Sequence, residues 1–298
     1  MQLNDNEAFL SFLDYITADE AIHIRATREV TEIANHLRAS ESFRLLFHGV
    51  VPLGLFAHDR LTRTATGDCF YNVDIALALD LFESSKATIN DLFEVVTAPY
   101  GSQAIARLNL TNRPTTLVIL RRPLCIRVCF LDTTGKQTHF TRLLYEDGFH
   151  SANPAGLVQW IHSTDAKTQG VFIAILQIFE WWTHSSTIAE VLPIDLLAPL
   201  IGPSLEIRPD KFLWEHLAES TELLLAAFSK SFPITYQDPT AATQRLWHFR
   251  CEELDRVREF LTNAVDLMEQ LGPDTSECWS AVLGKPFLGS TFSYDIWS

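Results

Sequence analysis

The stretch Phe70 to Leu79, FYNVDIALAL, constrains the fold more than any other part of the chain. Its first residues alternate polar and apolar side chains, and from Ile75 to Leu79 the run is continuously apolar. A strand with one face in water keeps its alternation, whereas a strand covered on both faces becomes apolar throughout. The stretch therefore predicts a strand buried on both faces, with Asp74 as its one carboxylate.

Helical spacing surrounds this strand on both sides. Apolar residues recur at intervals of three and four from residue 6 to about 47, which predicts two amphipathic helices with Thr17 or Asp19 as a cap between them. Residues 49–69 carry Pro and Gly and little periodicity, so they predict a loop that leads into the strand. Residues 86–98 return to helical spacing.

The next segments are rich in β-branched residues. TTLVIL (Thr115 to Leu120) and LCIRVCFL (Leu124 to Leu131) are joined by RRP, which predicts a hairpin, and DTTGK then predicts a second turn. Beyond Asn153 the spacing is almost entirely helical. The apolar run VFIAILQIF has nine residues, whereas a membrane span needs about twenty, so we expect a buried core helix.

This order of helices, mixed sheet and helices predicts an α+β protein. With 298 residues, of which 47% are hydrophobic, the chain forms one large domain or two packed lobes. We expect N-terminal helices over residues 1–47, a mixed-sheet core over 48–155 and a helical lobe over 156–298, with a cleft between the sheet and the C-terminal helices.

Charge and cysteine content limit the partners and the compartment. Lys and Arg number 23 against 37 Asp and Glu, a net charge of −14, so a phosphate backbone meets net repulsion and nonspecific nucleic-acid binding is disfavoured. The opening residues are acidic and mixed, which argues against a signal peptide. No CxxC pair occurs, and we expect a cytoplasmic protein without membrane attachment whose cysteines are reduced core residues: Cys69, Cys125, Cys129, Cys251 and Cys278.

Asn72, Val73 and Asp74 raise the question of a metal site. Metal-assisted phosphoryl transfer needs clustered carboxylates to hold Mg²⁺, and a strand with Asp-x-Asp delivers two of them to one face. Residues 72 and 74 share a face, but the first is an amide. Asp74 is thus either the remnant of a metal site or a charge at a strand edge.

The segment VPLGLFAHDRLTRTATGDCFYNVDI resembles the signature of nucleotidyltransferases of the DNA polymerase beta superfamily, and it is most similar to the bacterial cGAS/DncV-like group of antiviral signalling. Four later segments resemble elements of the same group in the same order: TTLVILRRPLCIRVCF, SANPAGLVQWI, FPITYQDPT and ECWSAVLGKPF. The resemblance covers roughly residues 45 to 290. It implies a polymerase beta-like core sheet with flanking helices and a C-terminal helical lobe.

The departures from the family pattern concentrate on the chemistry. Gly54 keeps its place, but Leu55 stands where the family has the Ser that cradles a triphosphate. Asn72 replaces the first metal ligand, and Arg127 aligns with the third carboxylate. Glu180 falls near the position of a Lys that faces the phosphates in the family, where a carboxylate would repel them.

Several roles stay open at this point. Arg127 points to solvent or pairs with Asp74 or Asp132, and Asp132 or Asp68 is a candidate for a displaced metal ligand. The histidines show no HxxxH spacing, so a generic surface or half-buried role is expected for them. The adjacent Trp181 and Trp182 point about 100° apart on a helix, which predicts that one of them lines the cleft or a partner surface.

The resemblance leaves three functional hypotheses. The first is a degenerate nucleotidyltransferase, silent in catalysis and without a cofactor, with a binding or regulatory role in bacterial defence or nucleotide signalling. The second is an active enzyme that makes oligonucleotides from NTPs, with Asp74 holding Mg²⁺. The third is a structural scaffold that partners an intact paralogue. We expect a nucleotide as a ligand and a protein as a partner, the latter in a homo- or hetero-oligomer.

Overall fold

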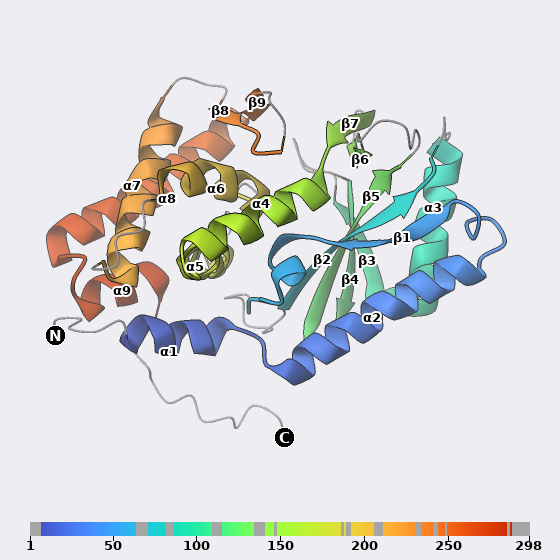
Figure 1. Ribbon diagram of the computed structural model, residues 1–298, viewed down its shortest axis with the longest axis horizontal. Helices are drawn as coiled ribbons and strands as arrows, with labels where there is room; N and C mark the ends of the chain where they lie inside the picture. The colour runs from blue at the N-terminus through green and yellow to red at the C-terminus, as the bar shows by residue number, and fades with distance from the viewer. Residues whose placement is uncertain are drawn as a thin grey trace.

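The structure is a computed structural model, shown in Figure 1, and the chain is described over the following residues. They are 7–63, 71–81, 86–108, 115–133, 141–145, 148–185, 188, 192–205, 211–230, 234–240, 244–247, 249–284 and 287.

A mixed sheet of seven strands forms one half of the molecule, as the sequence predicts. The main order is β1-β2-β5-β4-β3, and β6 and β7 extend it from the end of β5. β5 is parallel to β2, whereas the other pairs are antiparallel. The strands are β1 Phe47–Pro52, β2 Tyr71–Leu79, β3 Ala104–Leu108, β4 Thr116–Arg121, β5 Leu124–Asp132, β6 Thr141–Tyr145 and β7 Gly148–Ala152.

The interior strand β2 is covered on both faces, which confirms the prediction from its apolar run. One set of alternate residues, including Val73 and Leu77, packs with α2 (Glu20–Ala39) and α3 (Lys86–Thr97). Ala76 and Ala78 belong to the opposite face, in a small cluster with residues of β5, β6 and β7. Because side chains alternate along a strand, Asn72 and Asp74 share this second face. The polar positions of β2 thus point away from α2 and α3.

A helical lobe forms the other half, and α5 runs through its middle (Figure 1). α5 is in contact with α1, α4, α6, α7 and α9, and its apolar side chains are buried on nearly all sides. This confirms VFIAILQIF as a core helix. The lobe consists of α1 Glu7–Ile16, α4 Pro154–Lys167, α5 Val171–Ser185, α6 Ile194–Ile201, α7 Leu213–Ser229, α8 Cys251–Leu271 and α9 Ser276–Leu283. Among the described residues, no helix is long and apolar enough to cross a membrane.

The two N-terminal helices pack on different halves. α1 inserts Phe9 and Phe12 into the core of the helical lobe, against Trp279 and Trp181. α2 packs on the sheet instead. Asp19 caps α2 by accepting a hydrogen bond of 2.9 Å from the Ile22 amide, which confirms it as the cap between the helices.

Most described residues beyond 153 are helical, as expected, but β8 (Ile234–Gln237) and β9 (Gln244–Trp247) form a separate hairpin that the sequence did not predict. One expectation from the sequence is wrong. β1 lies in the segment expected to be a loop. The sequence did not reveal this strand because its Gly and Pro are poor strand formers, and the strand is held by its pairing with β2.

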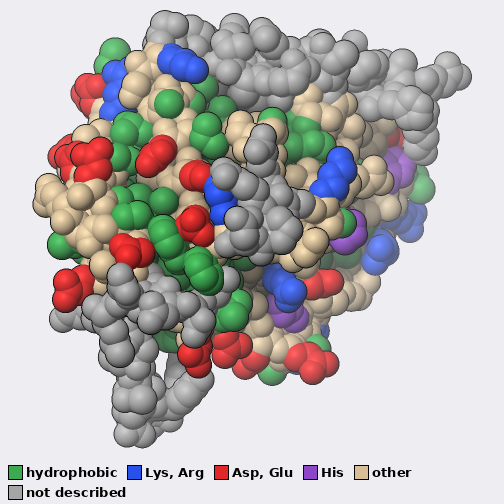
Figure 2. Space-filling model, turned by 60° about the vertical axis from the view of Figure 1, so that its left-hand side comes forward, with side chains coloured by type: hydrophobic (Ala, Val, Ile, Leu, Met, Phe, Trp, Pro, Cys, Tyr) green, Lys and Arg blue, Asp and Glu red, His purple; other side chains and the backbone are tan. Residues whose placement is uncertain are grey.

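Acidic side chains dominate part of the molecular surface. Figure 2 shows clusters of Asp and Glu around apolar side chains over the left half of the face in view. Exposed acidic residues also follow one side of α8, namely Glu252, Asp255, Glu259, Asp266 and Glu269. This surface agrees with the net charge of −14 and would repel a polyanion.

Candidate functional site

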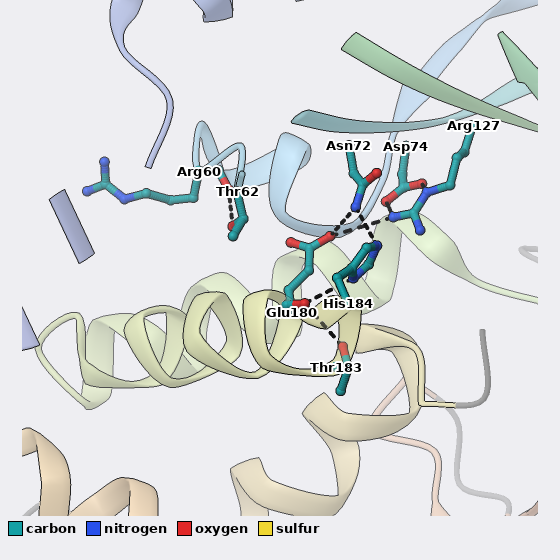
Figure 3. Close-up of polar contacts among 8 residues, drawn as sticks. All are labelled: Arg60, Thr62, Asn72, Asp74, Arg127, Glu180, Thr183 and His184. Carbon is teal, nitrogen blue, oxygen red and sulfur yellow. Dashed lines mark hydrogen bonds and ion pairs between the residues drawn. The ribbon is translucent and has the colours of Figure 1, made fainter. Parts of the chain in front are cut away.

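A cleft of about 190 Å³ opens between the second face of the sheet and the helices α4, α5 and α6. This confirms the expected cleft between the sheet and the C-terminal helices. Gly54, Asp74, Arg127 and Glu180 line it, so the fold brings together most of the candidates that the sequence singled out. Figure 3 shows how their side chains converge from β2, β5 and α5.

Asp74 and Arg127 form a bidentate ion pair across two parallel strands. The register places them directly opposite each other on β2 and β5. Arg127 donates from Nε to Oδ1 and from Nη2 to Oδ2 of Asp74, each at 2.5 Å. Burial opposes the charge on Arg127, but the adjacent Asp74 carboxylate outweighs this and raises the pKa of the guanidinium. Of the open alternatives for Arg127, the structure therefore selects the pair with Asp74.

Glu180 joins the helical lobe to this pair. It is buried on α5, and its Oε1 accepts a hydrogen bond of 3.2 Å from Nδ2 of Asn72 and lies 3.6 Å from Nη2 of Arg127. Burial raises the pKa of Glu180 from 4.5 to about 7, while the Arg127 charge opposes that shift. Arg60 points away from this group in Figure 3. The carboxylate expected to face phosphates thus faces the guanidinium.

His184 completes the network, and sequence reasoning missed it. Its Nε2 lies 2.9 Å from Nδ2 of Asn72, and its Nδ1 lies 3.0 Å from the Glu180 carbonyl oxygen. Both ring nitrogens are thus within hydrogen-bond distance of a polar partner, and the tautomer sets which of them donates. The signal in the sequence was the spacing of four between Glu180 and His184, which places both on one side of α5.

The loop at Gly54 touches the Asp74 carboxylate. The Leu53 amide donates to the Asp74 carbonyl oxygen at 2.8 Å, and Gly54 follows with φ of +52° at the start of a short 3-10 helix, Gly54–His58. A Cβ at this position would lie 3.1 Å from Oδ2 of Asp74. Leu55, expected in the phosphate-binding loop, is instead buried in the core of the helical lobe. It does not line the cleft.

The residues present do not fit the Mg²⁺ site of a nucleotidyltransferase. Both oxygens of Asp74 accept hydrogen bonds from Arg127, and this guanidinium places a positive charge next to the one carboxylate of β2. No group of three or more His, Cys, Asp or Glu within the described ranges could hold a metal ion. Asp132 accepts from the Leu81 amide and forms an ion pair with Arg142, so it does not act as a displaced ligand. Asp68 lies outside the described residues.

Two further expectations concern residues around the cleft. Trp181 and Trp182 are both buried in the helical core, so the expectation that one of them lines the cleft or a partner surface is wrong. Asp195 on α6 and Asp238 after β8 line the cleft, and they were not singled out as candidates. Asp238 lies in the family-like FPITYQDPT segment, which was the available signal.

The fold is that of the bacterial cGAS/DncV-like nucleotidyltransferases, the CD-NTases, as the resemblance implied. The structure is similar to CdnG from Bradyrhizobium diazoefficiens, solved with GTP, with a TM-score of 0.73 and 13% identity over 95% of this chain and 96% of that chain. It is also similar to CdnC from E. coli MS115-1, solved with ATP, with a TM-score of 0.69 and 11% identity over 96% and 99%. DncV of Vibrio cholerae, a cyclic AMP-GMP synthase, gives a TM-score of 0.60 and 11% identity over 94% and 86%. No family model and no curated protein sequence matches the chain.

Proposed function

We propose that this protein is a CD-NTase-fold protein whose nucleotidyl-transfer site is catalytically silent. Its cleft would then serve binding or regulation in bacterial antiviral defence or nucleotide signalling. The observation that carries the proposal is the bidentate contact between Arg127 and Asp74 at 2.5 Å.

The chemistry explains why this contact opposes catalysis. In-line attack of a hydroxyl on an α-phosphate needs metal ions that neutralise the phosphate charge and activate the nucleophile. A guanidinium neutralises charge, but it remains protonated and binds no water as a Lewis acid would. It also occupies both oxygens of the one carboxylate that the strand retains.

The surroundings of the pair support the same proposal. The Gly54 loop contacts Asp74 rather than presenting a hydroxyl, because Leu55 turns into the core. Glu180 adds a buried carboxylate that shares Arg127 with Asp74. A bound triphosphate would have to compete with Asp74 and Glu180 for the guanidinium that they share.

A protein partner fits a silent site. CdnC has been solved in a complex with HORMA-deltaN. For this chain we propose a partner of protein character, which includes a second copy or an intact paralogue. The scaffold hypothesis becomes the better description if the cleft binds no nucleotide at all.

Isothermal calorimetry with ATP and GTP, with and without Mg²⁺, tests the proposal on the full chain. We expect no heat that depends on Mg²⁺, and no nucleotide product on prolonged incubation. Asp74→Ala and the surface control Asp255→Ala, whose side chain is 75% exposed, are measured in parallel. Mg²⁺-dependent binding that is lost in Asp74→Ala and kept in the control would overturn the proposal in favour of the active enzyme.

A further inference from the structure

Two histidines from separate elements stack where the 3-10 helix Gly54–His58, here called η1, meets α4. The ring centroids of His58 and His162 lie 6.4 Å apart, and the two ring planes are within 10° of parallel. His162 is exposed on α4, whereas His58 is half-buried at the end of η1. The pair therefore lies at the interface between these two elements, which are in contact.

The buried side of the His58 ring has no place for a second proton. Its Nε2 is shielded from solvent and has no hydrogen-bond partner among the described residues. A protonated imidazole carries an N–H on both nitrogens, so protonation would leave a buried donor at Nε2 without an acceptor. Such a donor is costly because it loses its bonds to water and gains none in return. The closed interface therefore favours the neutral ring.

The charged groups that face His58 offset this cost only in part. Burial first and the charge of His162 second lower the pKa of His58 below its ordinary value of 6.5. Asp165 on α4 and Asp59, the next residue in the chain, act in the opposite direction. Asp165 is also engaged elsewhere, because its Oδ1 accepts a hydrogen bond of 2.8 Å from the Ile173 amide.

A third histidine lies close to the end of η1. Burial lowers the pKa of His23 on α2, with smaller effects from Asp59, which raises it, and from Arg60, which lowers it. His23 therefore also resists protonation, and a test must separate its response from that of His58.

The interface between η1 and α4 forms one wall of the cleft. Gly54, at the start of η1, lines the cleft and would contact the Asp74 carboxylate through any Cβ. α4 reaches from the helical lobe toward the sheet in Figure 1 and lines the cleft with Leu157, Val158 and Ile161. A change in the packing of η1 on α4 would therefore reach the cleft directly.

We propose that the stacked His58–His162 pair is an acid-sensitive latch, which keeps η1 packed on α4 while His58 is neutral and releases this wall of the cleft when His58 is protonated. The stacking, the unpartnered buried Nε2 and the position of both elements on the cleft carry the proposal together. It assigns a regulation to the cleft and rests on the proposed function, which gives that cleft a binding role.

The expected response has a definite direction and an upper limit. In the released form His58 regains the ordinary pKa of 6.5, so this form takes up a proton at a higher pH than the closed form. The opening equilibrium should therefore grow as pH falls, by at most about tenfold between pH 7.5 and pH 5.5. Burial raises the pKa of Glu180 to about 7, and a group with a raised pKa stabilises the folded state as pH falls. An acid-induced opening thus cannot come from Glu180.

Hydrogen exchange of the full chain, followed by mass spectrometry, measures this opening in peptides over residues 54–59 and 156–162. After correction for intrinsic exchange rates, we expect opening to increase by about three- to tenfold from pH 7.5 to pH 5.5. His58→Phe keeps an aromatic ring but cannot be protonated, and its response should stay below about twofold. An equal response in His58→Phe, or no response in the natural sequence, would overturn the proposal.

Two more variants control this comparison. His36→Phe, in the last turn of α2, which packs on the sheet, is the matched control and should keep the full response. His162→Gln changes an exposed side chain and should reduce the response, because it removes the second imidazole. Circular dichroism verifies that each variant is folded. If His58→Phe does not fold, His162→Gln decides, and an undiminished response in that variant would refute the role of the stacked pair.

The test uses neither nucleotide nor metal ion, so the two proposals fail in different ways. Mg²⁺-dependent product from ATP or GTP refutes the silent site, whatever the exchange at η1 and α4 shows. A chain that is silent toward nucleotides and opens equally at both pH values refutes the latch alone.

Discussion

Replacing Arg127 with methionine tests whether the ion pair organises the cleft. Methionine keeps an unbranched side chain but removes the guanidinium, which leaves Asp74 and Glu180 as neighbouring carboxylates without a cation. Breaking a fully buried pair in this way costs about 3–5 kcal/mol, whereas an exposed pair contributes about 0–1 kcal/mol. Both side chains of the Asp74–Arg127 pair are 24% exposed. We therefore expect the free energy of unfolding to fall by about 2–3 kcal/mol.

A double-mutant cycle separates the pair from its surroundings. Asp74→Asn alone leaves Arg127 with Glu180 as its remaining carboxylate, at 3.6 Å. The double variant Asp74→Asn/Arg127→Met removes both charges of the ion pair. We expect a coupling energy of about 1.5–2.5 kcal/mol, within the usual range for contacting residues. Asp255→Asn is the exposed control and should change the free energy of unfolding by less than about 0.5 kcal/mol.

Urea denaturation supplies these free energies. Far-ultraviolet circular dichroism reports both halves of the molecule, and tryptophan fluorescence reports mainly the helical lobe, where Trp181, Trp182 and Trp279 are buried. Coincident transitions are required before the values are compared. A coupling energy below about 0.5 kcal/mol would show that the contact between Arg127 and Asp74 does not hold the cleft together.

Three further predictions concern the same site. Because the pKa of Glu180 is raised from 4.5 to about 7, the folded state retains a proton that the unfolded state has lost between these pH values. The free energy of unfolding should fall as pH rises through this window, and Glu180→Gln should remove at most about 3 kcal/mol of that decline. Urea denaturation of both proteins at pH 5 and pH 8 measures the difference. Parallel pH profiles of the two proteins would contradict this prediction. Gly54→Ala should lower the free energy of unfolding by about 1 kcal/mol more than Gly101→Ala, as measured in urea. Both residues have positive φ, but only a Cβ at position 54 would contact the Asp74 carboxylate. Equal losses in the two variants would refute this reasoning. The double variant Asn72→Asp/Arg127→Asp should bind Mn²⁺ saturably in calorimetry, unlike the natural sequence, and an absence of heat would show that more than these two positions blocks the metal.

Local patterns were enough for the principal elements. The apolar run of β2 and the continuous apolar character of α5 each predicted an element that the structure contains. Asp19 and Asn153 cap the helices that follow them, since short polar side chains satisfy the first free amides of a helix. Segments with weak periodicity, such as β1 and the β8–β9 hairpin, were missed because their order comes from pairing with a neighbouring strand.

The candidate site was predicted in part. Family resemblance selected Asp74, Arg127 and Glu180, and all three line one cleft. It could not settle whether Arg127 reaches solvent or a carboxylate, because that depends on the register between β2 and β5. His184 was assigned a generic role, since its contact with Asn72 joins residues 112 positions apart in the chain.

The sequence by itself determined that residues 71–79 form a strand buried on both faces and that α5 is a buried helix. These properties follow from side-chain type and from the periods of two and 3.6 residues, which are local. Only the tertiary structure decided that Arg127 forms an ion pair with Asp74, that Leu55 turns into the core and that Asp195 and Asp238 join the cleft. The physical reason is that ion pairing and burial depend on distances across strands and lobes, and the folding of the whole chain sets those distances.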